Sequence, residues 1–119
     1  MAFPSSRNKQ DGPAAEDLAA RYLQQQGLRL VARNYRCRGG EIDLIMQTED
    51  TLVFVEVRLR RSQRFGGAAA SVDATKQARV IHAARHYLGT RDMPCRFDVL
   101  LMDDVDAARI EWIRNAFGE

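Results

Sequence analysis

Two short apolar runs on either side of a polar break constrain what this chain can fold into more than any other feature. Residues 39–46 and 52–58 are rich in β-favouring side chains, and Glu49-Asp50 lies in the break between them. This pattern predicts a β-hairpin. Because side chains alternate between the two faces of a strand, the apolar residues of both strands must share one face. The most compact register pairs residue 46 with 53, 44 with 55 and 42 with 57.

The same register makes Asp43 and Glu56 neighbours on the opposite face. Two carboxylates about 5 Å apart repel each other by roughly 3 kcal/mol at an effective dielectric constant of 20, whereas a cross-strand pair normally contributes less than about 1 kcal/mol. The break lacks the glycine that favours a two-residue turn, so a register shifted by two residues is the alternative. The two acids remain neighbours on one face in that register as well. A hard divalent cation bound by oxygen ligands would compensate the repulsion. A polar outer face neutralised by Arg58 and Arg60 is the alternative.

The whole chain has the properties of one cytoplasmic domain. Its 119 residues, 45% of them hydrophobic, suffice for a single core. No stretch has the roughly 20 apolar residues of a membrane span, and the first residues lack the apolar core of a signal peptide. Cys37 and Cys95 lack metal-ligand spacing and are expected to be reduced. We expect a disordered tail over residues 1–11 and a domain over residues 12–119.

Charge is unevenly distributed although the net charge is only +2. Residues 41–57 contain five acids and no base, whereas residues 58–91 contain eight bases and one acid, Asp73. A basic segment next to an acidic pocket suits a phosphate-rich partner, although charge balancing across a surface explains it equally well. The arginines expected to contact nucleic acid are Arg58, Arg60, Arg61, Arg64 and Arg79.

The remaining elements alternate between helix and strand. Helices are expected from Gly12-Pro13 to Gly27 and from a cap at Ser71 to Leu88, and further strands over residues 28–36, 96–102 and 108–113. The order α-β-β-β-α-β-β predicts an α/β sandwich around a central mixed sheet, with a parallel crossover through the second helix.

Lys76 occupies an unusual position on that second helix. It shares the buried stripe of the helix, one turn before Val80. Its ammonium group could extend outward to solvent or reach the hairpin carboxylates. His82 and His86 are spaced like metal ligands, but they project from another side of the helix and are expected to face solvent.

The hairpin resembles a known catalytic motif. Gly-Glu-Ile-Asp-Leu-Ile is followed by Val-Phe-Val-Glu-Val-Arg, with the Glu thirteen residues after the Asp. This arrangement is similar to the catalytic hairpin of the PD-(D/E)xK nucleases, which have the restriction-endonuclease-like fold. From about Gly12 to Phe117 the chain resembles the YraN family of bacterial endonuclease-like proteins. The matching segments are 15–16 with 22–23, 33–36, the hairpin, 65–66, Val72 with Lys76, 96–99 and 116–117.

The resemblance implies a metal-dependent endonuclease acting on DNA, including branched or distorted structures. Asp43 and Glu56 would hold Mg²⁺ or Mn²⁺, together with the backbone carbonyl of Val57 and with Glu16 as a further ligand or base. Glu16 has an alternative role at the positive end of the first helix dipole.

The motif differs from the superfamily pattern at its last position. Arg58 stands where the superfamily has Lys, and an arginine cannot act as a base. Lys76 could replace the missing lysine, so the expected catalytic set is Glu16, Asp43, Glu56, Arg58 and Lys76. The alternative is a non-catalytic module on a nuclease fold that binds nucleic acid or a protein partner, and a purely structural subunit is a third hypothesis. The oligomeric state stays open, and a homodimer is compatible with the sequence.

Overall fold

A computed structural model describes residues 3–59, 72–103 and 109–118, with side chains from residue 13 onward. The elements are α1 (Phe3–Gln25), β1 (Arg29–Cys37), β2 (Gly40–Thr48), β3 (Thr51–Leu59), α2 (Ala74–Leu88), β4 (Cys95–Met102) and β5 (Ile110–Phe117). The five strands form one sheet in chain order, in which β3 and β4 are parallel and the other neighbours are antiparallel. The predicted α/β fold with a mixed sheet is confirmed.

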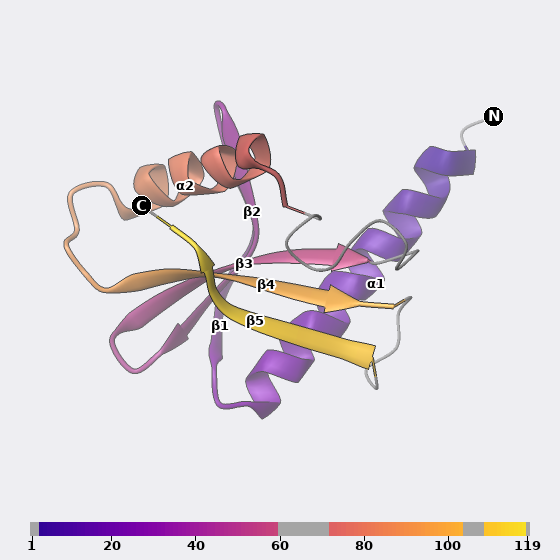
Figure 1. Ribbon diagram of the computed structural model, residues 1–119, viewed down its shortest axis with the longest axis horizontal. Coiled ribbons are helices and arrows are strands. Elements are labelled where there is room, and N and C mark those ends of the chain that lie inside the picture. The colour runs from indigo at the N-terminus through magenta and orange to yellow at the C-terminus, as the bar shows by residue number, and fades with distance from the viewer. Residues whose placement is uncertain (1–2, 60–71, 104–108, 119) are drawn as a thin grey trace.

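The two helices cover opposite faces of the sheet (Figure 1). Ala15, Ala19 and Leu23 form the buried stripe of α1 and pack on Leu44 and Val55. On the other face, α2 buries Val80, Ala83 and Ala84 against a second apolar cluster. That cluster contains Ile42, Ile45, Leu52, Phe54 and Phe97. The sheet is therefore the central layer of an α/β/α sandwich.

The β2–β3 hairpin has the predicted register. Met46 pairs with Val53 and Leu44 with Val55, and a two-residue turn with Glu49 at φ 54° joins the strands. The ladder between the two strands ends at Leu44, and beyond it the Val57 N–H donates to Asp43 Oδ2 at 2.9 Å.

The predicted position of Ile42 is wrong. Ile42 was expected to share a face with Leu44, but it packs in the cluster beneath α2. It lies opposite Tyr35 of β1, whose ring contacts Tyr87 of α2 edge-on. Because Ile42 lies beyond the ladder between β2 and β3, the alternation of that ladder does not fix its face.

Both helix starts differ from the predictions. The structure begins α1 at Phe3 rather than at Gly12, and Pro13 lies inside the helix. The predicted cap Ser71 lies outside the described residues, and α2 is capped by Asp73, which accepts from the Lys76 N–H at 2.8 Å. The division into a tail and a domain stays a prediction.

In the described part of the chain, no helix combines the length and the apolar character needed to cross a bilayer. The 23 residues of α1 are long enough, but their composition is too polar. The cytoplasmic location stays a prediction.

Gly40 fixes the distance between β2 and α2. A Cβ atom at this position would lie 2.3 Å from the Arg79 carbonyl oxygen and 3.1 Å from Ala83 Cβ. The glycine therefore lets the first residue of β2 approach the helix backbone directly. The preceding Gly39 has φ 87°, which turns the chain from β1 into β2.

We expect Gly40→Ala to destabilise the protein by about 1–3 kcal/mol, because the added methyl group must displace helix backbone. Chemical denaturation measures the change in the free energy of unfolding. Gly118→Ala is the matched control, since its Cβ would meet only the Phe97 ring at 3.8 Å. Equal stability of the two variants would contradict the proposed contact.

Candidate active site

Asp43 and Glu56 lie at the point where β2 and β3 separate. Glu56 is almost fully buried, with 2% of its surface exposed. In the described part of the chain, Glu56 Oε1 is the one buried side-chain oxygen or nitrogen without a hydrogen-bond partner. Asp43 is partly buried and accepts the Val57 N–H. The hairpin thus brings two acids together where one carboxylate oxygen has no hydrogen bond.

Lys76 enters the same place from α2. Its Nζ atom lies 3.4 Å from Glu56 Oε2 and 3.4 Å from Glu41 Oε2. The side chain is only 19% exposed. Of the two alternatives for Lys76, the structure shows the inward one: the ammonium group bridges two carboxylates on different strands.

Burial and the neighbouring Asp43 carboxylate raise the pKa of Glu56 to about 8. Lys76 and Arg58 act in the opposite direction but do not cancel this effect. Burial also raises the pKa of Asp43 above its usual value. Both shifts arise because a charged carboxylate loses hydration inside the protein. At neutral pH Glu56 therefore retains its proton, and a bound cation would favour its ionised form.

Glu16 approaches this pair from α1. Burial, followed by the Asp43 carboxylate, raises the pKa of Glu16, so the two acids interact although they come from different layers. Arg33 of β1 lies 3.8 Å from Glu16 and 2.6 Å from Asp17. Glu16 is therefore near the hairpin acids and also paired with a surface arginine.

The other predicted site residues do not all lie beside Asp43 and Glu56. The Arg58 guanidinium lies 3.7 Å from Glu56 Oε2 and is about one-third exposed. Val57 contributes its N–H to the site, through the bond to Asp43. Arg79 is exposed on α2 and belongs to a neighbouring hollow. Arg60, Arg61 and Arg64 lie outside the described residues.

The donor set fits a hard cation only in part. Carboxylate oxygens suit Mg²⁺ or Mn²⁺, and the unpartnered Oε1 of buried Glu56 has the character of a ligand atom. However, no group of three His, Cys, Asp or Glu side chains in the described residues is arranged to hold a metal. Mg²⁺ commonly uses one or two carboxylates and keeps several waters. Asp43 and Glu56 therefore satisfy the minimum for this ion.

Glu41 was missed by the sequence reasoning. It lies two residues before Asp43 on the same strand, and its carboxylate contacts Lys76 at 3.4 Å and Arg36 at 3.9 Å. The spacing of two residues, which places both acids on one side of an ideal strand, was the available signal.

Asp98 is a second buried carboxylate, and its surroundings differ from those of Glu56. It is fully buried on β4 and accepts hydrogen bonds from Arg96 Nε, Trp112 Nε1 and the Asn115 N–H at 2.9–3.1 Å. Trp112 and Asn115 lie on β5, so their bonds join β5 to β4 where the register between the two strands shifts. Because its oxygens are satisfied, Asp98 has a structural role.

His82 and His86 do not belong to the site. Both are exposed, as predicted. His82 Nε2 hydrogen-bonds the Arg38 carbonyl at 2.9 Å, and His86 Nδ1 bonds the Tyr35 hydroxyl. They attach α2 to β1 and to the turn that follows it.

Fold and site together define an α/β sandwich protein with the element order of a nuclease-like fold. The model of the family described as "Uncharacterised protein family UPF0102" matches residues 15–102. The chain belongs to this family, which is the YraN family suggested by the sequence.

Relatives extend the match over nearly the whole chain. A UPF0102 protein of Nitrosomonas europaea is 60% identical over 117 residues, covering 97% of this chain and 98% of the relative. A UPF0102 protein of Cupriavidus metallidurans is 59% identical over 119 residues, covering 98% and 87%. One from Ralstonia pickettii is 54% identical, covering 99% and 98%.

We expect stability to fall as pH rises from about 4.5 to about 8 in metal-free buffer. The folded protein binds the Glu56 proton more tightly than the unfolded chain does, so this stabilisation is complete below pH 4.5 and lost above about 8. Each unit of pKa shift corresponds to about 1.4 kcal/mol, so the loss should be a few kcal/mol.

Urea denaturation across this pH range tests the expectation. Glu56→Gln should flatten the decline, because the amide carries no ionisable proton. Glu49→Gln, at the exposed hairpin turn, should retain it. An unchanged slope in Glu56→Gln would show that the decline has another origin.

Proposed function

We propose that this protein is a metal-dependent endonuclease of the PD-(D/E)xK kind that hydrolyses phosphodiester bonds in DNA, including branched or distorted structures. One observation carries the proposal: the unpartnered oxygen of buried Glu56 lies in a cluster with Asp43 and Lys76. A sheet built only for stability would fill such a position with an apolar side chain, because a buried unsatisfied carboxylate costs free energy.

Asp43 and Glu56 are the proposed ligands of Mg²⁺ or Mn²⁺, with the Val57 carbonyl and Glu16 as additional ligands. When bound, the ion supplies an activated water and stabilises charge on phosphate oxygens. The protein's own contribution is to hold the two carboxylates close together in a site from which most solvent is excluded. Burial raises the pKa of Glu16, which makes it a stronger base than a hydrated carboxylate.

Lys76 and Arg58 supply positive charge from two sides of Glu56. Both cations lie within 4 Å of Glu56 Oε2. Either is positioned to stabilise the extra negative charge of a pentacoordinate phosphate. Lys76 is the less exposed of the two, so its charge is screened less by solvent. We therefore assign it the role of the motif lysine.

Nucleic acid binding is assigned to the arginines of the basic segment. Arg58 and Arg79 lie on described elements, and the predicted Arg60, Arg61 and Arg64 complete the set. Binding of this kind is electrostatic and weakens with salt.

A non-catalytic binding module is the second candidate. It is favoured by the absence, among the described residues, of a group of three side chains able to hold a metal. In that case Lys76 would neutralise Glu41 and Glu56 permanently, and the fold would carry binding alone.

Cleavage assays separate the two candidates. Flap, junction and single-stranded DNA substrates should be cut with Mg²⁺ or Mn²⁺, and Asp43→Asn should abolish cutting. Lys76→Ala should lower the rate about a hundredfold, the usual effect of removing one transition-state charge, while DNA affinity changes little. Arg58→Lys should preserve or raise activity.

Glu49→Gln, on the same hairpin but at its exposed turn, is the matched control and should cut normally. If neither the wild type nor Arg58→Lys cuts any of these substrates, the binding module is the better account.

A further inference from the structure

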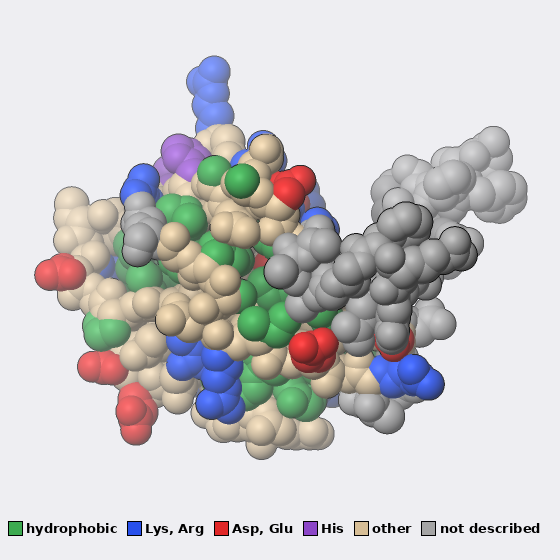
Figure 2. All heavy atoms as spheres, viewed as in Figure 1, with side chains coloured by type: hydrophobic (Ala, Val, Ile, Leu, Met, Phe, Trp, Pro, Cys, Tyr) green, Lys and Arg blue, Asp and Glu red, His purple; other side chains and the backbone are tan. Residues whose placement is uncertain are grey.

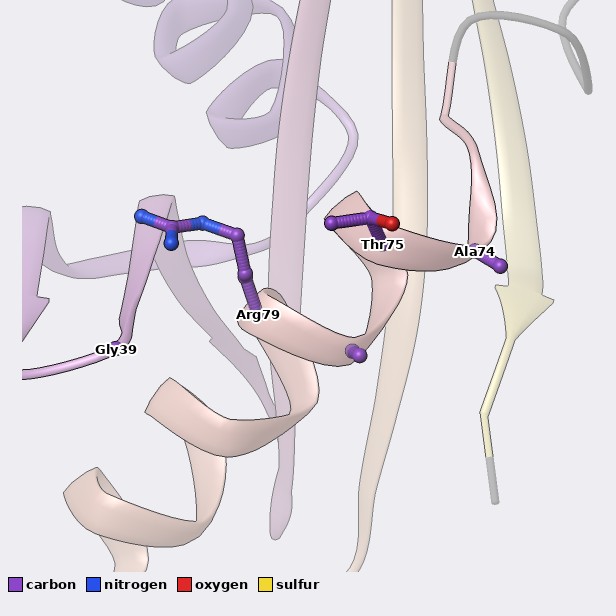
Figure 3. Close-up of a pocket in the computed structure, with 5 residues that line it drawn as sticks. Gly39, Ala74, Thr75 and Arg79 are labelled. Carbon is purple, nitrogen blue, oxygen red and sulfur yellow. The ribbon is translucent and has the colours of Figure 1, made fainter.

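A hollow of about 430 Å³ lies between α2 and the turn that joins β1 to β2. It is lined by Gly39, Ala74, Thr75, Ala78 and Arg79. Four of these five residues are small, so backbone and methyl groups form most of its surface. Figure 3 shows the Arg79 side chain extending from α2 toward the strand beside Gly39, with Thr75 one turn earlier on the helix.

The walls of the hollow are held in place. Gly40 lies directly against the Arg79 carbonyl, and His82 holds the turn through the Arg38 carbonyl. A Cβ atom on Gly39 would come within 3.4 Å of the His82 ring. The turn and the helix therefore form a fixed pair of surfaces around a shallow hollow that is open to solvent.

The charge around the hollow favours an anion. The sequence of α2 contains one lysine, two arginines and no acid. In the described part of the chain, no ion pair or hydrogen bond engages the Arg79 guanidinium. Figure 2 shows a blue basic side chain projecting above the tip where β1 turns into β2. The neighbouring acids are already engaged: the Asp73 carboxylate accepts from the Lys76 N–H, and Glu41 contacts Lys76 and Arg36.

The hollow borders the candidate active site on both of its elements. Thr75 precedes Lys76 on α2, and Gly39 is two residues before Glu41 on the other side. Lys76 and Glu41 contact each other at 3.4 Å. The hollow therefore adjoins the Lys76–Glu41 contact along both chain segments.

We propose that this hollow binds one nucleotide of an unpaired strand next to the phosphodiester at the carboxylates. Arg79 and the Thr75 hydroxyl contact its phosphate, and the sugar and base rest on the small residues. A base paired within a duplex must lose its pairing and stacking energy to enter the hollow, so the preferred substrate has a single-stranded segment. This placement rests on the proposed function, but the binding itself does not require cleavage.

Fluorescence anisotropy with a labelled oligothymidine strand of about twelve nucleotides, in EDTA, tests the proposal. At about 0.1 M salt, Arg79→Ala should weaken binding about fivefold and lower the slope of log affinity against log salt by about 0.7, the contribution of one phosphate on a single strand. Arg85→Ala, which removes an exposed arginine outside the hollow on the same helix, should have a smaller effect.

A second variant fills the hollow without changing charge. Ala78→Leu should weaken binding of the strand but not of a duplex of equal length, whereas Ala14→Leu, at an exposed alanine of α1, should change neither. Equal effects of Arg79→Ala and Arg85→Ala, or unchanged strand binding in Ala78→Leu, would overturn the proposal. The binding assay contains EDTA and no metal, so it is independent of cleavage. A protein that binds the strand as predicted but cuts no DNA would contradict only the proposed endonuclease activity. A protein that cuts DNA but binds the strand equally well without Arg79 would contradict only the proposed nucleotide site.

Discussion

The burial of the Glu56 carboxylate is the constraint on which the rest of this site depends. A charged group with 2% exposure and an unpartnered oxygen is costly, and the raised pKa expresses that cost. Asp98 shows that the same sheet can bury a carboxylate with its oxygens satisfied by hydrogen bonds. The incomplete partnering of Glu56 is therefore a local property of the hairpin, and it is the strongest physical reason to assign function there.

Two close contacts hold α2 in the position that serves this carboxylate. Gly40 lets the start of β2 touch the helix backbone, and the Asp73 cap fixes the first turn at the Lys76 N–H. Together they direct the Lys76 side chain at Glu56 and Glu41. The close approach at Gly40 and the contacts of Lys76 with the acids therefore depend on the same packing of α2 against the hairpin.

Much of this arrangement could be predicted from the sequence because it follows from periodicity. The alternation of apolar and polar residues predicts the pairing of Leu44 with Val55, which the structure shows. Helical spacing likewise predicts that Lys76 lies on the sheet side of α2. Features set by tertiary contact could not be predicted. Ile42 lies on the α2 face of the sheet because the ladder with β3 ends before it. The contact between Glu41 and Lys76 depends on where α2 packs against the sheet. The cap of that helix is Asp73 rather than Ser71.

Calorimetric titration of Mn²⁺ into the metal-free protein near pH 7 tests the central claim most directly. Metal binding requires ionised ligands, and Glu56 has a pKa of about 8, so binding should release close to one proton, measured as a dependence of heat on the buffer. Glu56→Gln should lose both the binding and the proton release, and Glu49→Gln should keep them. An unchanged isotherm in Glu56→Gln, or no binding at millimolar Mn²⁺ in the wild type, would contradict the account.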